Sequence, residues 1–199
     1  MKKTKIKMLS AILLLAVVLI SSCKKEETTV KTVTENPFTT LFNDNVLSDS
    51  TLNYTVKNSS VFEFGFEFSV TKNGKVTQLG VKNPDAGDIR ATLWDLTDTS
   101  IIAQTTVTVV ANTMKFNNLA TAVELSTSKK YAITMLSNDW FGKKRTSYAD
   151  YPYPITKGNI KIEKYGYTHS TFGLDAIYIA SFHTDYLAGI VDFTYETEE

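Results

Sequence analysis

The sequence contains few of the residues that most often carry chemistry in enzymes. It has one cysteine and two histidines, and its acidic and basic side chains balance at 21 each. A single cysteine excludes an intrachain disulfide. The histidines, His169 and His183, lack the close ligand spacing typical of zinc sites. No Gly-x-Ser-x-Gly or phosphate-binding loop sequence occurs. We therefore predict a non-catalytic protein without a metal or cofactor.

Long apolar runs are also absent, with one exception near the start. Residues 9–20 are apolar except for Ser10, and they follow a basic segment that ends at Lys7. This run is shorter than the roughly 20 apolar residues that a transmembrane helix needs, and its order matches a secretory signal. The small residues before Cys23 resemble the lipobox that the lipoprotein-specific signal peptidase recognises. The resemblance implies that residues 1–22 are removed and that Cys23 carries a diacylglycerol, usually with a further acyl chain such as palmitate on its amine. Two or three chains anchor a protein durably to a membrane.

The residues after Cys23 bear on where the protein is displayed. The run Lys24-Lys25-Glu26-Glu27 resembles the surface-export signal of lipoproteins in one large group of Gram-negative bacteria. This resemblance implies a lipid-anchored protein of the bacterial outer membrane that is exposed on the cell surface. The alternative is that the charged run is only the solvated start of a linker.

The charge and length of the processed chain limit its partners and its domain count. Without the four lysines of the signal it has 17 basic and 21 acidic residues, a formal charge of −4. Nucleic-acid binding needs a basic surface, so we expect no nucleic-acid partner. The remaining 177 residues suit one domain with a substantial core. Residues 23–50 are predicted to be the lipidated cysteine and a flexible tether, and residues 51–199 to be the domain.

From residue 51 the pattern is that of short strands. In residues 62–70, four phenylalanines and a valine alternate with Glu, Gly, Glu and Ser, which predicts a half-buried strand. The following Asn73-Gly74 is a strong hairpin signal, so residues 76–81 are expected to return beside that strand. Further strands are predicted at 89–94, 101–109, 113–116, 123–125, 131–136, 160–165, 177–181 and 187–195. Many short strands with regular turns predict an all-β fold, an antiparallel β-sandwich.

Several motifs within residues 59–195 resemble one family. They are Phe64-Gly65-Phe66-Glu67-Phe68, Leu79-Gly80-Val81, Arg90-Ala91-Thr92-Leu93-Trp94-Asp95, Ile101-Ile102-Ala103, Val123-Glu124-Leu125, Lys130-Tyr131-Ala132-Ile133 and Tyr186-Leu187-Ala188-Gly189-Ile190-Val191-Asp192-Phe193. In this order they are similar to a domain-of-unknown-function family of bacterial extracellular β-sandwiches, some of which accompany carbohydrate-active modules. The resemblance implies a sandwich of the jelly-roll type, and it supplies no catalytic residues.

Residues 138–157 differ from the rest because they lack clear alternation. We predict a long loop here, and loops of this length in compact domains are often functional. Sugar rings stack on exposed Trp and Tyr rings while polar side chains bind the sugar hydroxyls. The candidate ligand-binding residues are Trp140, Tyr148, Tyr151, Tyr153, Asp139 and Arg145. Alternatively, the loop packs its own aromatic rings against the edge of a sheet. Tyr165, Tyr167 and His169 extend this aromatic content.

Two pairs of acidic residues are weaker candidates. Asp95 and Asp98 suit either a calcium site or ordinary turn hydrogen bonds, and no EF-hand sequence surrounds them. Glu63 and Glu67 lie on one face of a predicted strand, about 13 Å apart along it. That separation is too large for either glycosidase geometry.

These features together favour a cell-surface lipoprotein with a non-catalytic binding or adhesion module. A glycan is favoured slightly over a protein as its ligand. One alternative is a structural or accessory subunit of an envelope complex, which predicts an exposed apolar patch. The third is a hydrolase, which requires clustered acids or histidines in a cleft.

Overall fold

The computed structural model describes residues 31–43, 51–147, 149–170 and 175–199. The export signal, Cys23, the charged run after it and Tyr148 therefore lie outside the described residues. No helix in the described ranges is long and apolar enough to cross a membrane. The unit considered below is residues 32–199.

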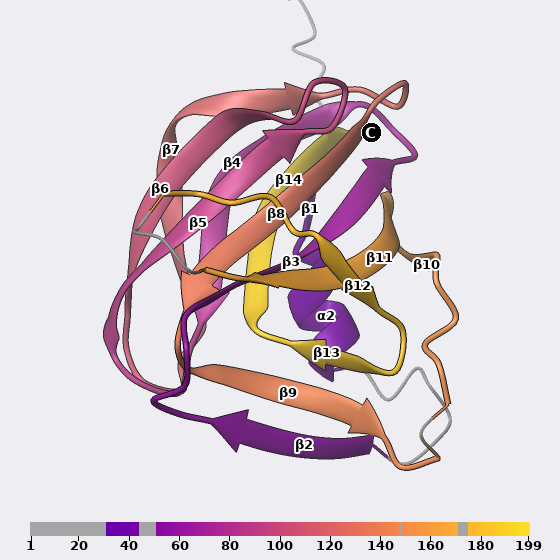
Figure 1. Ribbon diagram of the computed structural model, residues 1–199. Helices are drawn as coiled ribbons and strands as arrows, with labels where there is room; N and C mark the ends of the chain where they lie inside the picture. Colours follow the sequence, from indigo (N-terminus) through magenta and orange to yellow (C-terminus); the bar gives the residue numbers. More distant parts are fainter. Residues whose placement is uncertain (1–30, 44–50, 148, 171–174) are drawn as a thin grey trace, which may run out of the picture. The chain divides into compact units, whose positions relative to one another are not determined.

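Antiparallel strands make up most of this unit, and they form three sheets (Figure 1). The first sheet has the order β1-β14-β4-β7, with bounds Thr32–Glu35, Ile190–Glu198, Gly74–Lys82 and Lys115–Leu125. The second has the order β10-β11-β3-β8-β5-β6, with bounds Ile155–Lys157, Ile160–His169, Phe62–Val70, Lys130–Ser137, Gly87–Asp95 and Ser100–Val109; β12, Ser181–His183, pairs with β11. The third sheet, β13-β9-β2, is built from Tyr186–Ala188, Trp140–Arg145 and Thr51–Val56. One short helix, α2, spans Pro37–Asn43.

Eight of these strands form a jelly-roll sandwich, which confirms the predicted fold class. The sheet β1-β14-β4-β7 faces the strands β3-β8-β5-β6 of the second sheet. Each connection between consecutive strands of these eight crosses from one sheet to the other, except the connection from β5 to β6. We call these eight strands the frame. Residues 138–189, which carry β9 to β13, are inserted between the last two strands of the frame, β8 and β14. We call them the insertion.

The turn after β3 differs from the prediction. β3 pairs with β11 and β8, whereas β4 pairs with β14 and β7, so the two strands lie in different sheets and form no hairpin. A type I′ hairpin turn needs positive φ at both central residues. In the described chain, neither Asn73 nor Gly74 is among the residues with positive φ. The Asn-Gly pair therefore carries the chain from one sheet to the other.

The core lies between the two larger sheets and includes part of the segment predicted as tether. Phe66 and Phe68 of β3 stack on Phe38 of α2 and Phe193 of β14, with ring centroids 4.7 and 4.6 Å apart respectively. Leu41 of α2 is buried in the same cluster. β1 adds a full antiparallel pairing with β14. The folded unit thus begins near residue 32 and not at residue 51, because β1 and α2 supply strand pairing and apolar burial.

β3 is buried on both faces, whereas its alternation predicts a half-buried strand. Glu63 is fully buried and Glu67 is 7% exposed. Residues 175–180 lie against this face, because the backbone N–H of Ile177 bonds to Glu63 and the hydroxyl of Tyr178 donates to Glu67. The alternation correctly predicted which face of β3 is polar and which is apolar. The polar face is nevertheless buried, because polar side chains that have hydrogen-bond or ion-pair partners can be covered by other segments.

The segment predicted as one long loop, residues 138–157, contains two strands. β9 pairs on one side with β2 and on the other with β13, and β10 pairs with β11. Four further strand predictions differ from the structure. Residues 113–116 and 123–125 belong largely to the single strand β7, and of the predicted strand 177–181 only Ser181 is in a strand, the first residue of β12. The predicted strand 187–195 is divided at Gly189, whose φ is +72°. Only glycine adopts such a φ readily, so this residue redirects the chain from β13 into β14.

Candidate functional site

A pocket of about 190 Å³ lies where the insertion and β2 meet the frame. It is lined by Tyr54, Val56, Phe62, Phe64, Trp140, Tyr167, Tyr186 and Ala188. Six of these eight side chains are aromatic, and five of the six rings are partly exposed. We call this site the aromatic pocket. Partly exposed rings gathered in one hollow are unusual, because large apolar side chains in a small domain are normally buried.

The first wall of the aromatic pocket continues the core stripe of β3. Phe62 and Phe64 point to the same face as Phe66 and Phe68 because side chains in a strand alternate between faces. Tyr167 of β11 lies opposite Phe64 in the antiparallel register. Its ring centroid is 5.6 Å from that of Phe62 and 6.1 Å from that of Phe64. The phenylalanine stripe thus runs from the buried core out into the pocket.

The second wall is the small sheet β13-β9-β2, whose strands β9 and β2 cross one end of the sandwich in Figure 1. Tyr54 lies opposite Gly142 in the register of β2 and β9, and Val56 lies opposite Trp140. A Cβ atom on Gly142 would come within 2.1 Å of the Tyr54 ring. The missing side chain therefore lets the Tyr54 ring lie across β9 and face the pocket.

The Trp140 ring joins the two walls. Its centroid is 5.5 Å from that of Phe62, with the rings nearly perpendicular, and 4.8 Å from that of Phe64. Edge-to-face and tilted pairs of this kind are the favoured aromatic geometries. Trp140 is thus held by the frame while part of its surface stays open to solvent.

The polar atoms of the aromatic pocket belong to uncharged groups. Burial, with the hydrogen bond to Tyr167 next, raises the pKa of Tyr186, and burial with the nearby Asp185 carboxylate raises the pKa of Tyr54. These phenols therefore remain protonated at neutral pH and can donate as well as accept hydrogen bonds. None of the eight lining side chains carries a charge.

The two histidines flank this site as ring partners. His183 stacks on Tyr167 with ring centroids 4.7 Å apart and planes 4° from parallel. The His183 ring is also 4.9 Å from that of Tyr186, and His169 lies 4.9 Å from Phe62. Within the described part of the chain, no group of three or more His, Cys, Asp or Glu side chains is arranged to hold a metal ion.

Of the residues predicted for ligand binding, Trp140 lines the aromatic pocket, and Tyr151 and Tyr153 do not. Tyr151 is 2% exposed, and its hydroxyl lies 3.4 Å from the carbonyl oxygen of Lys143. Burial raises the pKa of Tyr151 to about 12. Tyr153 packs against the core cluster, and burial raises its pKa as well. These two rings take the alternative that the sequence left open, packing inward.

The two polar residues predicted with them have structural contacts of their own. Asp139 is 6% exposed, and its carboxylate accepts a hydrogen bond of 2.6 Å from the backbone N–H of Asn58. Arg145 donates to the carbonyl oxygen of Asp150 at 2.5 Å. Tyr148 lies outside the described residues. Of the five predicted residues that the structure describes, one, Trp140, lines the pocket.

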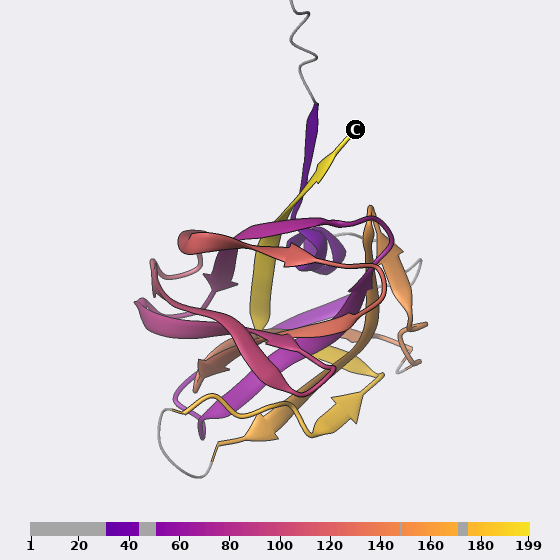
Figure 2. The ribbon, with the colours of Figure 1, turned by 90° about the horizontal axis from the view of Figure 1, so that it is seen from above.

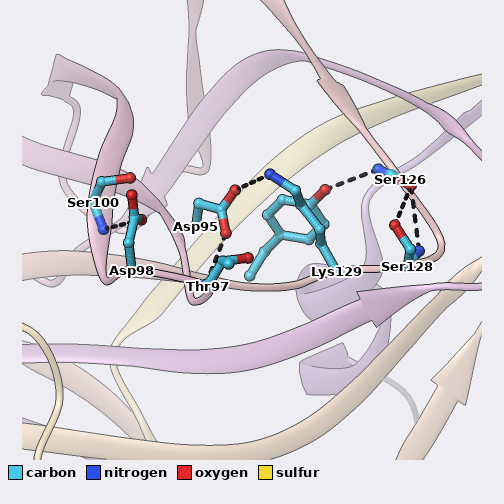
Figure 3. Close-up of polar contacts among 8 residues, drawn as sticks. Asp95, Thr97, Asp98, Ser100, Ser126, Ser128 and Lys129 are labelled. Atoms are coloured by element: carbon cyan, nitrogen blue, oxygen red, sulfur yellow. Dashed lines mark hydrogen bonds and ion pairs between the residues drawn. The ribbon is translucent and has the colours of Figure 1, made fainter.

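The Asp95 and Asp98 pair makes turn contacts (Figure 3). Asp95 accepts from the backbone N–H of Thr97 at 2.8 Å and from the Lys129 ammonium at 2.7 Å. Asp98 accepts from the backbone N–H of Ser100 at 3.1 Å. The hydrogen bond from Lys129 lowers the pKa of Asp95 to about 2. The backbone contacts of both residues match the turn hydrogen bonds that the sequence offered as the alternative to a calcium site.

Glu63 and Glu67 each form an ion pair on the outer face of the second sheet. The Glu63 carboxylate pairs with Arg90 and accepts a hydrogen bond of 2.6 Å from the Thr134 hydroxyl. Burial raises the pKa of Glu63, against the lowering effect of these two partners. Glu67 pairs with Lys164 at 3.0 Å. Both carboxylates are engaged and covered, which does not match the open acid pair of a glycosidase.

A wider hollow of about 630 Å³ lies at the beginning of β1 and the end of β14. Its charged lining residues have both signs, and Lys75 pairs there with Glu196 at 3.6 Å. None of its lining side chains is aromatic. We therefore regard the smaller aromatic pocket as the candidate functional site.

No family model matches the chain, and no curated protein matches its sequence. Membership of the family suggested by the short motifs therefore stays a prediction.

The pocket residues that sequence reasoning missed had weak signals. Tyr54 alternates with Val56 in residues 51–56, which is a period of two but too short to be distinctive. Phe62 and Phe64 have the same pattern as the core phenylalanines that follow them, so sequence alone assigned them to the core. Their place in the pocket, and the partial exposure of Phe62, depend on where the frame stops covering β3, which is a property of the whole fold.

Proposed function

We propose that this protein is a cell-surface lipoprotein whose sandwich domain binds carbohydrate non-catalytically through the aromatic pocket. The observation that carries the proposal is the set of partly exposed aromatic rings on both walls of one pocket. Sugar rings offer apolar C–H faces to such rings, and the phenolic hydroxyls of Tyr54, Tyr167 and Tyr186 can bind sugar hydroxyls.

The origin of the pocket residues supports a binding role. The jelly-roll frame is complete in its eight strands without the insertion or β2. Yet six of the eight lining residues come from those added segments, and only Phe62 and Phe64 come from the frame. Segments that the frame does not need for closure thus build the site, as expected for function placed on a stable scaffold.

The location of the pocket within the unit also suits a tethered protein. The chain enters the unit at Thr32, which pairs with Glu198 beside the C-terminus. β1 and the end of β14 project together in Figure 2. In Figure 1 the C-terminus lies at the top, and β2 and β9 lie at the bottom. The strand by which the chain enters the unit and the strands β2 and β9 of the pocket therefore lie at different ends of it.

A glycan array probed with the soluble chain that begins at Lys24 tests the proposal. We expect Trp140→Ala to weaken the binding of every glycan by roughly fivefold or more, because a well-packed ring contributes on the order of 1 kcal/mol. The matched control is Tyr151→Phe, which changes a buried tyrosine outside the pocket and should leave binding unchanged. Binding that survives Trp140→Ala would place the carbohydrate site elsewhere.

A second candidate ligand is an apolar side chain of an envelope protein, because the pocket lining has no charge and few polar atoms. Tyr167→Phe and Tyr186→Phe separate the two ligands. A sugar loses hydrogen bonds in these variants and is expected to bind more weakly. An apolar side chain keeps its ring contacts, and its binding should be unchanged or slightly tighter.

The anchor is tested in intact cells. Cys23→Ser should abolish incorporation of a clickable palmitate analogue and release the protein from membranes. Replacing Lys24 to Glu27 with Ser and Ala should leave the lipid label in place but remove access of an external protease to the protein. Unchanged protease access would show that the charged run is only part of a linker.

A further inference from the structure

The size of the aromatic pocket limits how much of a ligand can enter. Pockets that enclose a drug-sized ligand measure roughly 300–1,000 Å³, whereas an apolar cavity of about 150 Å³ holds one benzene ring. The aromatic pocket, at about 190 Å³, has room for one six-membered ring. A second sugar residue would have to remain outside.

The shape of the site points the same way. Phe62, Phe64 and Tyr167 form one wall, and Tyr54, Val56, Trp140, Tyr186 and Ala188 form the other. A flat row of rings can hold the middle of a long chain lying across it. Here the two walls meet at an angle, because the Trp140 and Phe62 rings are in contact with their planes 78° apart. Such a corner instead admits a ring edge-on, with the rest of the chain leading away. An end or a branch of a glycan has such a free ring.

The absence of charge in the site selects among such rings. None of the eight lining side chains is charged, and their polar atoms belong to the phenols and the indole. A carboxylate entering this pocket would lose its hydration without gaining a cationic partner, which is strongly unfavourable. Phenols held in the protonated form provide hydrogen bonds suited to neutral hydroxyl or acetamido groups.

We infer that the aromatic pocket binds a single uncharged sugar residue end-on, at a chain terminus or branch tip, and excludes uronic and sialic acids. This inference rests on the carbohydrate-binding function proposed above and specifies its ligand class. Val56 provides a direct test, because it belongs to the wall formed by the small sheet, lies on β2 and is partly exposed.

The experiment compares Val56→Phe with wild type and with Thr55→Phe. Thr55 is the neighbouring, exposed residue on the opposite face of β2, so its substitution is the matched control. If the site is a pocket for one sugar residue, an added phenyl ring fills it and blocks binding. If the site is a flat stacking surface, the added ring enlarges that surface. We therefore expect Val56→Phe to weaken binding by roughly tenfold or more and Thr55→Phe to leave it unchanged. The melting temperature of each variant is measured in parallel to verify folding.

The ligand probes are methyl glycosides of neutral hexoses, 6-deoxyhexoses and N-acetylhexosamines, set against methyl glucuronide and methyl sialoside, in calorimetry and saturation-transfer NMR. End-on binding predicts that one neutral glycoside binds within about tenfold of the tetrasaccharide it terminates, and that the acidic glycosides bind at least about tenfold more weakly. An affinity that rises with each added residue, or that survives Val56→Phe, would overturn end-on recognition while keeping carbohydrate binding. Failure of all glycans to bind, or binding insensitive to Trp140→Ala, would instead overturn the proposed function.

Discussion

Gly142 positions a residue of the aromatic pocket although it does not line the pocket itself. Its lack of a side chain leaves the space that the Tyr54 ring occupies. We expect Gly142→Ala to displace that ring and reduce glycan binding by roughly tenfold, with a modest loss of stability from the local clash. Binding is measured by calorimetry, and Thr55→Ala on the paired strand is the control. Wild-type affinity in Gly142→Ala would mean that Tyr54 contributes nothing to the ligand.

Glu63 is the residue whose charge depends most on its partners. It is fully buried, and among the described residues Arg90 is the cation that pairs with it. Glu63→Gln keeps an acceptor for Thr134 but leaves the guanidinium without its counter-ion, so we expect a loss of about 3 kcal/mol in the free energy of unfolding. Urea denaturation measures it. The control Lys57→Gln breaks an exposed pair with Asp85 and should cost less than about 1 kcal/mol.

Residue patterns predicted polarity better than they predicted burial. The alternation in residues 62–70 identified β3 and the face that contains Phe66 and Phe68. It could not show that Glu63 is covered, because the covering segment lies more than a hundred residues later in the sequence. Trp140 was found as a binding candidate from its residue type, whereas Tyr151 has similar chemistry and is buried.

Among the elements, α2 depends on a residue far from it in sequence. The Asp192 carboxylate accepts hydrogen bonds from the backbone N–H groups of Phe38 and Thr39, at 3.1 and 2.6 Å. These are donors of the first helical turn, which has no partners within the helix. Asp192 therefore holds α2 against β14 at the place where the chain enters the frame.

The burial of Asp192 makes this contact depend on pH. Burial raises the pKa of Asp192 to about 6, with hydrogen bonds opposing the shift. Between about pH 4 and 6 the folded state binds the proton on Asp192 more tightly than the unfolded chain does. The stabilisation that comes from this proton is therefore full at lower pH and is lost as the pH rises through 6. Relative to Asp192→Asn, the wild type should lose up to about 3 kcal/mol between pH 4 and 7. Urea unfolding across this range measures the difference, and parallel curves for the two proteins would contradict the assignment.

Elements formed by long-range pairing were the hardest to predict. β9 contains the run Lys143-Lys144-Arg145, which resembles an exposed loop, and it is a strand because β2 and β13 pair with it on both sides. α2 has seven residues, too few to show a helical period. Strands whose own sequence alternates, such as β5 and β6, were predicted closely.

For the molecule as a whole, the folded unit starts earlier than the composition suggests. We expect a chain that begins at Thr32 to unfold cooperatively with the same melting temperature as one that begins at Lys24. A chain that begins at Thr51 lacks β1 and α2, including the buried side chains of Phe38 and Leu41. Each such side chain is worth about 1.5–3 kcal/mol, a large share of the roughly 5–15 kcal/mol that stabilises a domain. Near-ultraviolet circular dichroism during heating tests this, and a native-like transition in the shortest chain would contradict it.

The sandwich class was predictable from the sequence because it depends on strand number and alternation. The insertion was not, because no local pattern reports which strands close the frame and which are additions. The aromatic pocket was consequently found only in part. Its two walls come from β2, β3, β9, β11 and β13, which are separated in sequence and meet only in the assembled fold.

The pairing of β1 with β14 also determines when the first sheet can form during synthesis of the chain. The first strand of the frame has the last strand as its partner, from Thr32 with Glu198 to Glu35 with Tyr195. While the ribosome is making the chain, the first sheet cannot be completed until β14 has emerged. Such distant contacts form slowly because a long loop must close first. The first sheet of the nascent chain thus stays incomplete until late in synthesis, which would suit the export proposed above, because a narrow channel threads an unfolded chain.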